Sequence, residues 1–591
     1  MPTLQPTPLR SGPVTFRTIL KSVLHHVKSH VGIGIVCSVA YFDPGNWSVD
    51  LQAGANFGYR PMLFVLLLSG LGAMVLQTLA CKLGCVTGID LASHCRLLLH
   101  DHPTHPRLVR RMVMYPLYIC AEIAIISTDL AEVIGSAIGI CLIFPSLPLW
   151  AGVILTALDV LVFLLFSDPS RRQGKPVRVF ELIIMTLVFA VFACFIVLLL
   201  RVHPRWTGVF LGYIPDKKLF QSHPNALYVA VGILGATIMP HALFLGSFLA
   251  TQDREALHKP TPANLPEPSN RKKLKRNTKT FFMDLFRITP AERAAAAKDY
   301  RSRYGVRENN TLLFVKRHLH HIVIDVCSSI LVFAVPINSA ILILSATVFF
   351  DKLTSKDMAG MTIGLFDAHA LIHARIGSGS AFLFALALVV AGQSSSITAT
   401  LAGQVVGEGF IEWRVSPFLR RLLTRSISLI PSVVVAVAVG RNGIDNLLII
   451  SQVVLSVALP FVAFPLIYLT SSKVVMRVQK PPSPPSAAET FDFERTSVHA
   501  SEPAADSSEP SLRGGIQEVD VEESINSSPN SNGTPTHKSE NEDISDAISI
   551  DNIEYIDYSN SRLMSALAYL IWAVILITNV YTMVALGLGD T

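Results

Sequence analysis

Two short polar motifs interrupt long apolar segments of this chain, and both contain residues that can bind a cation. Residues 43–46 read Asp-Pro-Gly-Asn, and residues 239–241 read Met-Pro-His. Proline removes a backbone donor and clashes with the preceding turn, so each helix should break where its polar residues lie. Two interrupted helices in corresponding halves of a membrane protein are a strong indication of a transporter's substrate site. The sequence therefore predicts a protein that carries a cation across a membrane.

The two motifs offer hard and soft ligands together. Asp43 and Asn46 supply oxygen atoms, and after a Pro-Gly break both side chains can point into one cavity. The thioether of Met239 is soft and favours transition metals over Ca²⁺ and Mg²⁺. A broken helix also frees backbone carbonyls, and that of Ala236 lies about one turn before Met239. We expect these four residues to form a site that suits Mn²⁺, Fe²⁺ or Cd²⁺, the alternative for Met239 being simple core packing.

Three acidic residues fall on one face of another apolar segment. Asp129 and Glu132 are three residues apart, and Glu122 is seven residues before Asp129. The helical period therefore places all three on one stripe. Ionisable groups inside a membrane are costly and usually functional. The stripe is typical of a proton relay, although a structural salt-bridge network would use the same residues, and His241 could be either a proton group or a structural hydrogen-bonding residue.

Composition indicates an all-α polytopic membrane protein. Of 591 residues, 51% are hydrophobic and only 16% are charged, and the mean hydropathy is +0.47. A helix needs about 20 apolar residues to cross the hydrocarbon core. We count eleven crossings, one around Asp43 and the others at 62–81, 114–143, 149–166, 179–200, 226–250, 322–350, 382–402, 426–440, 447–469 and 563–588.

Lysine and arginine predict the orientation and the domain boundaries. With the N-terminal tail (1–30) in the cytoplasm, the connections richest in positive charge lie on the same side of the membrane. The two long hydrophilic insertions, 251–317 and 475–560, then also lie in the cytoplasm. They separate crossings 1–6 (31–250), crossings 7–10 (318–474) and the last crossing (561–591).

The two insertions differ in character. The first is basic and polar. The second is rich in serine, proline and acidic residues, and such a segment cannot bury enough apolar surface to fold, so we expect it to be disordered. It could bind regulatory or trafficking proteins, or it could be a plain linker.

The eight cysteines are scattered along the chain. Cys81 and Cys85 are four residues apart, but no second pair completes a zinc site. We interpret the cysteines as small buried apolar residues.

Four motifs together resemble the natural resistance-associated macrophage protein (NRAMP) family. They are residues 43–46, 122–132, 239–241 and 392–404, in the family's order. The long insertions and the Leu-Phe-Leu-Gly-Ser sequence after 241 are most similar to fungal members. The resemblance implies a LeuT-like fold, with segments 1–5 and 6–10 as inverted repeats plus an eleventh transmembrane helix. It also implies a metal–proton symporter, not an enzyme, with no cofactor.

The resemblance also assigns roles to residues of this sequence. Asp43, Asn46, the Ala236 carbonyl and Met239 would hold the metal, and Gln77 would lie near the cavity. The implied proton route contains His241, Glu122, Asp129, Glu132, Arg420 and Arg421.

Two positions depart from the family pattern. Ala458 stands where many relatives have a glutamine, so a water or backbone oxygen would have to replace it in the metal shell. Gly246 stands where many relatives have a second histidine, which leaves the proton path open.

Expected partners are divalent metal ions, protons and the lipid bilayer, with no nucleic acid. The membrane is either the plasma membrane or an endosomal or vacuolar one. Two alternative functions remain: transport of another cation, such as Mg²⁺ or aluminium, and a metal sensor or signalling protein on the same fold. Met239 argues against the Mg²⁺ alternative.

Overall fold

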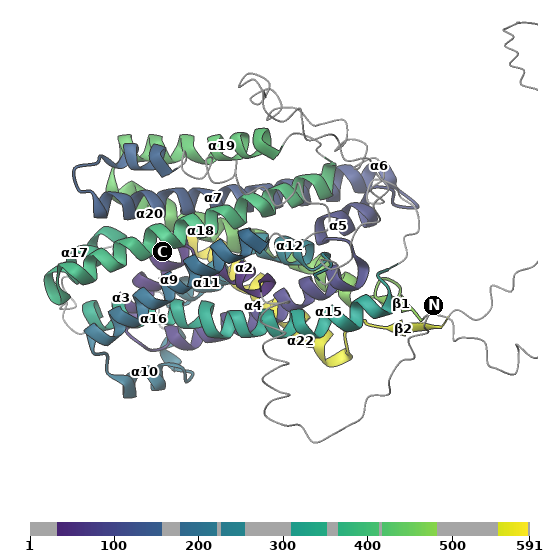
Figure 1. The fold of residues 1–591 in the computed structure, drawn as a ribbon, viewed down its shortest axis with the longest axis horizontal. Helices are drawn as coiled ribbons and strands as arrows, with labels where there is room; N and C mark the ends of the chain where they lie inside the picture. Colours follow the sequence, from purple (N-terminus) through teal and green to yellow (C-terminus); the bar gives the residue numbers. More distant parts are fainter. Residues whose placement is uncertain are drawn as a thin grey trace, which may run out of the picture. The chain divides into compact units, whose positions relative to one another are not determined.

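The structure is a computed structural model that describes residues 32–156, 178–220, 226–254, 309–350, 364–412, 417–480 and 554–588. Nearly all secondary structure in these ranges is α-helical (Figure 1). Eight helical stretches in them are long and apolar enough to cross a membrane: Met62–Thr87, Pro106–Ile143, Glu181–Val202, Ala226–Leu249, Leu312–Phe350, Ser378–Ile411, Gly443–Ser471 and Arg562–Val584.

Two further elements match predicted crossings. The first is a broken helix made of α2 (Ile33–Val39) and α3 (Pro44–Phe57), and the second is α19 (Pro417–Ala438). The predicted crossing at 149–166 is described only as far as 156, so it stays a prediction.

The other helices of the described residues range from one turn to more than eight turns in length. They are α4 (Met62–Thr87), α5 (Leu91–Leu99), α6 (Pro106–Val109), α7 (Tyr115–Ile143), α9 (Arg178–Val202), α10 (Trp206–Gly212), α11 (Ala226–Thr237), α12 (Pro240–Leu249), α15 (Leu312–Ser329), α16 (Val335–Ser345), α17 (Leu365–Ile376), α18 (Ser378–Ile411), α20 (Arg441–Ser471) and α22 (Arg562–Leu588). Short π-helical turns at Arg110–Met114, Ile330–Ala334 and Ala346–Phe350 and a 3₁₀ turn at Lys217–Phe220 adjoin them.

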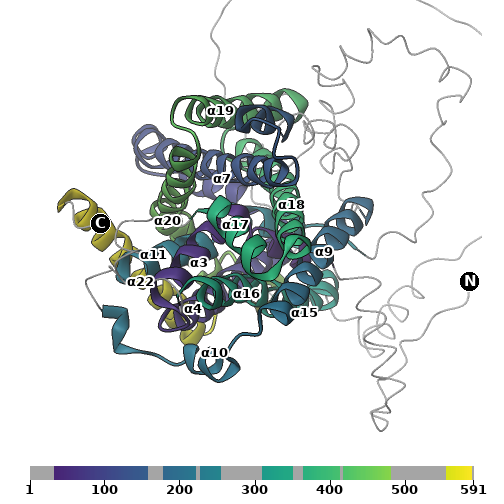
Figure 2. The ribbon, with the colours of Figure 1, turned by 90° about the vertical axis from the view of Figure 1, so that its left-hand side faces the viewer.

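Helix α7, which carries the acidic stripe, packs along α18, α20 and α19. Figures 1 and 2 both show it between α19 and α18. The backbones of α7 and α18 approach closely at glycines: a Cβ added to Gly139 would lie 2.6 Å from Val389 Cγ2, and one added to Gly392 would lie 2.2 Å from Ser136 Oγ. Small residues at such contacts are typical of helix packing in membranes.

Two helices are broken, as the proline motifs predict. The first break separates α2 from α3, and the second separates α11 from α12. Around them, α3 packs on α16, α11 packs on α20, and α12 packs on α4 and α18. The breaks are therefore enclosed by other helices, which is where non-helical backbone is tolerated at membrane depth.

The hydrophilic segments are described only in part. The tail 1–30, the stretch 255–308 and the stretch 481–553 lie outside the described residues, so their predicted cytoplasmic position stays a prediction. We expected the second insertion to be disordered over all of 475–560, and the structure differs from this at its two ends. Near its ends, β1 (Arg477–Gln479) and β2 (Tyr555–Asp557) form a two-stranded sheet. Each strand has only three residues, so the composition of the whole segment gives no sign of them.

Candidate metal site at the two helix breaks

Asp43 occupies the break between α2 and α3. Its backbone is extended, with φ −68° and ψ 167°, and its Oδ1 accepts the Asn46 N–H at 2.8 Å, which caps α3. Pro44 takes the first helical position, where a missing N–H does no harm. The side chain is fully buried, and its Oδ2 has no hydrogen-bond partner among the described residues. A buried carboxylate oxygen without a partner is unfavourable, which makes it a candidate metal ligand.

Asn46 offers a second set of unsatisfied atoms in the first turn of α3. The residue is 1% exposed. Neither its Oδ1 nor its Nδ2 finds a hydrogen-bond partner in the described part of the chain. Buried side-chain amides normally form hydrogen bonds, so these atoms also indicate a site for a ligand.

The second break brings Met239 and the end of α11 into the interior. Met239 is fully buried and has extended backbone, φ −85° and ψ 120°, directly before Pro240. Ala236 is also buried, and its carbonyl lies in the last turn of α11, where helical donors run out. A thioether and a backbone carbonyl are thus both present at this break.

Gln452 of α20 reaches the first break, which the sequence analysis did not foresee. A Cβ added to Gly45 would lie 1.7 Å from Gln452 Nε2, so the amide packs directly against the Gly45 backbone. The Gln452 Oε1 has no hydrogen-bond partner within the described ranges. Ala458 lies elsewhere, since its carbonyl faces the Cys120 thiol of α7 at 4.0 Å. Gln452 can therefore supply the oxygen for which we expected a water or backbone substitute.

Both breaks contact α7. A Cβ added to Gly135 would lie 2.0 Å from Pro44 Cβ, so α7 passes directly beside the first break. At the second break, His241 Nδ1 lies 3.2 Å from Thr128 Oγ1. Thr128 and Gly135 are two helical turns apart. One stretch of α7 therefore lies beside both candidate ligand groups.

The hydrogen bonds around Thr128 indicate which tautomer the neutral His241 ring adopts. The Thr128 hydroxyl donates to the Ala124 carbonyl at 3.0 Å, so its only proton is used. His241 Nδ1 must then donate to Thr128 Oγ1, which leaves Nε2 as an acceptor. Nε2 is buried and has no hydrogen-bond partner among the described residues. This nitrogen is therefore the acceptor that the neutral ring leaves unused among the described residues.

Asp129 forms a buried ion pair with Arg425 of α19. Arg425 Nη1 donates to Asp129 Oδ1, and Nη2 donates to the hydroxyl of Ser396 on α18. Arg425 is the arginine that meets the acidic stripe in the described structure. We had expected Arg420 and Arg421 in this role, but their side chains lie outside the described residues.

Glu132 lies one turn further along α7 and is fully buried. Its Oε1 accepts the Ser395 hydroxyl of α18 at 2.5 Å, while Oε2 has no partner in the described chain. Glu122 lies two turns nearer the start of α7 than Asp129 and is half-buried. The stripe therefore runs from the first break towards Arg425 and becomes more exposed at Glu122.

Gln77 of α4 lies beside the residues that precede the first break. It is fully buried, and its Oε1 accepts the Tyr41 hydroxyl at 2.7 Å. Tyr41 is two residues before Asp43. The predicted role of Gln77 as a polar group near the cavity stays a prediction.

The sequence analysis missed Gln452, Arg425, Ser395 and Ser396. Both serines lie in the 392–404 motif, which we quoted without assigning roles. The available signals were a lone glutamine inside an apolar helix and a third arginine that follows Arg420 and Arg421, because such residues at membrane depth are usually functional.

Comparison with known proteins identifies the family. Residues 34–485 match the family model described as natural resistance-associated macrophage protein-like. The chain belongs to the NRAMP family. It is therefore an integral membrane protein and a metal-ion transporter, not an enzyme.

Two curated fungal relatives illustrate the similarity. The manganese transporter pdt1 of Schizosaccharomyces pombe is 39% identical over 451 residues, which cover 76% of this chain and 76% of the relative. The iron transporter SMF3 of Saccharomyces cerevisiae is 36% identical over 459 residues, covering 77% and 84%. These matches confirm the NRAMP assignment.

A solved structure confirms the fold class. The manganese transporter of Eremococcus coleocola, crystallised as the mutant H236A, is 30% identical, with a TM-score of 0.58. The match covers 78% of this chain and 82% of that one. The predicted helical, polytopic NRAMP fold is thus correct.

Proposed function

We propose that this NRAMP member is a proton-coupled symporter of divalent transition-metal ions, with Mn²⁺ and Fe²⁺ as substrates and Cd²⁺ also accepted. The observation that carries the proposal is the fully buried Asp43 carboxylate, which has an oxygen without a partner in the described chain at a helix break. Asn46 follows it by three residues, and Gln452 packs against the Gly45 between them. The manganese and iron transporters among the relatives support the same class of substrate.

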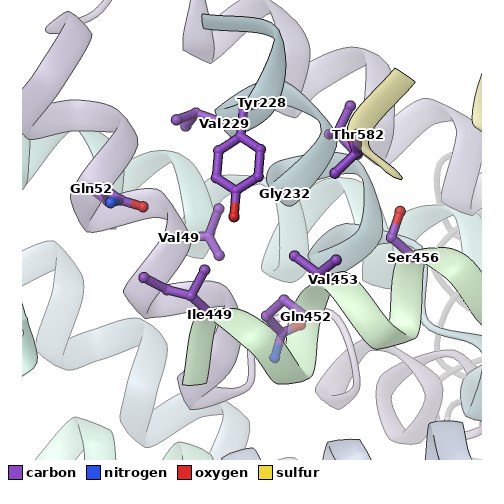
Figure 3. A pocket seen from close by; sticks show the side chains of 11 residues that line it. Val49, Gln52, Tyr228, Val229, Gly232, Ile449, Gln452, Val453, Ser456 and Thr582 are labelled. Atoms are coloured by element: carbon purple, nitrogen blue, oxygen red, sulfur yellow. The ribbon is translucent and has the colours of Figure 1, made fainter. Parts of the chain in front are cut away.

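The metal would enter through a pocket between α3, α11 and α20. Figure 3 shows Val49, Tyr228 and Gln452 around this pocket. Gln452 thus lines the pocket and contacts the first break at Gly45. With the N-terminus inside, α3 and α11 form the outer halves of the two broken helices. The pocket would then lie on the outer side of the first break, with Gln452 between it and Gly45.

At the site, Asp43, Asn46, Met239, the Ala236 carbonyl and Gln452 would replace the water around the ion. Asp43 supplies the one negative charge of this set, and a charge offsets the desolvation of a cation far better than neutral donors do. The sulfur of Met239 takes a place that an oxygen would otherwise hold, which favours softer ions over Ca²⁺ and Mg²⁺.

The coupled proton would travel along α7. Glu132 lies beside the first break, and Asp129 lies one turn further with Arg425 and Ser396 around it. Free acceptors at Glu132 Oε2 and His241 Nε2 are the groups that can hold a proton close to the metal. Arg425 stabilises the charged form of Asp129 and so favours release of a proton from this carboxyl group. Asp129 would then be ready to accept the next proton.

We place the protein in the plasma membrane or in an endosomal or vacuolar membrane, with regulatory or trafficking proteins as candidate partners of the cytoplasmic insertions. Alternating access around the two broken helices would move the metal inward.

Asp43→Asn is the variant that tests the metal site. Asparagine caps a helix as well as aspartate does, so α3 should keep its first turn while the charge is lost. Isothermal calorimetry on the purified protein should show that Mn²⁺ binding is lost, and proteoliposomes should show no Mn²⁺ uptake.

Asp90→Asn is the matched control. Asp90 is also buried, and it caps α5 in the same way, with Oδ1 accepting the Ser93 N–H at 2.9 Å. This variant should bind and transport Mn²⁺ normally. Normal Mn²⁺ binding by a folded Asp43→Asn protein would overturn the proposed site.

A further inference from the structure

A second group of donor atoms, made of residues other than the ligands described above, lies where α2, α4 and α12 meet. Cys37 comes from α2, Cys81 and Gln77 come from α4, and Gly246 comes from α12. Helix α12 packs against both α4 and α2. All four residues are buried.

The two thiols converge on one amide. Gln77 Nε2 lies 3.3 Å from Cys37 Sγ and 3.7 Å from Cys81 Sγ. The thiols also interact directly with each other. Cys81 Sγ in turn lies 3.5 Å from the Gly246 carbonyl oxygen. Two sulfurs from different helices and a backbone oxygen thus surround the end of the Gln77 side chain.

Glycine at 246 is what makes this arrangement possible. A Cβ there would lie 1.8 Å from Gln77 Nε2 and 3.2 Å from Cys37 Sγ. The Gln77 amide therefore fills the space that a side chain at 246 would take.

The Gln77 amide can present either of its ends to the sulfurs. In the orientation described, Oε1 accepts the Tyr41 hydroxyl at 2.7 Å. A half-turn of the amide places Nε2 against the Tyr41 oxygen and Oε1 against the sulfurs, and the hydroxyl can accept as readily as it donates. Gln77 Oε1 then joins the two sulfurs as a third donor, beside the Gly246 oxygen that lies 3.5 Å from Cys81 Sγ.

We propose that Cys37 and Cys81, with Gln77 and the Gly246 carbonyl, form a second metal site that binds soft divalent ions of the class of Cd²⁺ and Zn²⁺. Two sulfur and two oxygen donors suit the tetrahedral coordination of these ions. Both thiols lose their protons to water when the ion binds, because the thiolate is the ligand. Two thiolates neutralise the charge of a divalent ion, which allows a buried complex. Mn²⁺ prefers oxygen ligands and should bind there weakly.

The place of this site in transport rests on the proposed function. Cys37 lies on α2, the half of the first broken helix that precedes Asp43, and Gly246 lies on α12, which follows Met239. With the N-terminus inside, both are cytoplasmic halves. A soft ion that leaves Met239 towards the cytoplasm would then meet the two thiols next.

Cadmium absorption spectroscopy tests the site without relying on transport. Cadmium–thiolate bonds absorb strongly in the ultraviolet, whereas oxygen and thioether ligands give no such band. Full-length protein in detergent with a phosphine reductant should develop this band when Cd²⁺ is added. Asp43→Asn should keep the band, while Cys37→Ala and Cys81→Ala should each lose most of it.

Two further variants make the result specific. Cys95→Ala removes an equally buried thiol from α5 and should leave the band unchanged. Gly246→Ala keeps both thiols but displaces Gln77, so it should weaken the band. No band in the unmodified protein, or a band that survives in both Cys37→Ala and Cys81→Ala, would overturn the proposal. A protein that shows the band but does not take up Mn²⁺ would overturn the proposed function and leave the thiol site standing.

Discussion

Gln452 on α20 packs its amide against Gly45, the residue between the two candidate metal ligands of α3. A Cβ on Gly45 would lie 1.7 Å from Gln452 Nε2. The absence of a side chain at this position therefore allows the close approach of a second helix. The contact joins the first broken helix to α20 at the site where the ion would bind.

We expect Gly45→Ala to abolish most Mn²⁺ binding and uptake. The added methyl group must push Gln452 away from the break, and the site then loses a donor and its spacing. Calorimetry and uptake in proteoliposomes measure the effect. Gly72→Ala on α4 is the control, because its Cβ would meet Ile238 Cδ1 at an ordinary 3.4 Å. Equal Mn²⁺ binding by Gly45→Ala and Gly72→Ala would show that the Gln452 contact has no role in the site.

Met239 should determine selectivity among divalent ions. Met239→Leu keeps the buried volume, at a usual stability cost below about 1.5 kcal/mol, but removes the sulfur. We expect a large fall in Cd²⁺ uptake, a smaller fall for Mn²⁺ and measurable competition from Ca²⁺ and Mg²⁺. Competition uptake with all four ions is the measurement, and Met239→Ala should behave in the same way. An unchanged preference for Cd²⁺ over Ca²⁺ would mean that the sulfur only packs.

The Asp129–Arg425 pair should be required for proton coupling rather than for metal binding. Asp129→Asn removes a charge from a buried pair and leaves Arg425 uncompensated, so a stability loss of about 3–5 kcal/mol is expected. Changing both residues, Asp129→Asn with Arg425→Gln, should restore much of the melting temperature. Both proteins should bind Mn²⁺, but neither should acidify the proteoliposome lumen during uptake. Normal acidification by the double variant would exclude this pair from the proton route.

The helix breaks could be predicted from sequence because their cause is local. Pro44 and Pro240 disturb the backbone next to them, and Asp43, Asn46 and Met239 are within a few residues of these prolines. The partner of Asp129 could not be predicted in this way. Arg420, Arg421 and Arg425 are all close in sequence, and only the packing of α19 on α7 brings Arg425 to Asp129.

Long-range packing also explains the other residues that we missed. Gln452 is one of many residues of an apolar helix, and its importance depends on the glycine that it meets at 45. Gly246 was noticed as a missing histidine, but the side chain that fills its space, Gln77, comes from another helix. Contacts between helices far apart in the chain leave no local pattern in a single sequence.

A buried ionic cluster fixes the start of α2 and offers a test of stability. Asp325 of α15 accepts the N–H groups of Gly32 at 3.2 Å and Gly34 at 2.7 Å. Nearby, Arg254 Nη2 donates to Glu181 Oε1 at 2.5 Å, and both side chains are almost fully buried. Gly32 has φ 145°, and a Cβ there would lie 2.6 Å from Glu181 Oε2.

Arg254→Ala should therefore lower stability by about 3–5 kcal/mol, because it leaves the buried Glu181 charge without its main partner. Thermal unfolding in detergent measures this loss. Arg110→Ala, which removes a partly exposed pair with Asp101, should cost at most about 1 kcal/mol. Equal melting temperatures for the two variants would show that the cluster does not stabilise α2.

Simultaneous measurement of metal and proton flux tests the central claim most directly. Purified protein is reconstituted into liposomes that contain a Mn²⁺-sensitive dye and a pH-sensitive dye, and Mn²⁺ is added with and without an inward proton gradient. We predict that the gradient accelerates Mn²⁺ entry, that the lumen acidifies as Mn²⁺ enters, and that Asp43→Asn abolishes both signals while Asp90→Asn preserves them. Mn²⁺ entry that ignores the gradient and produces no acidification would contradict proton-coupled transport by this chain.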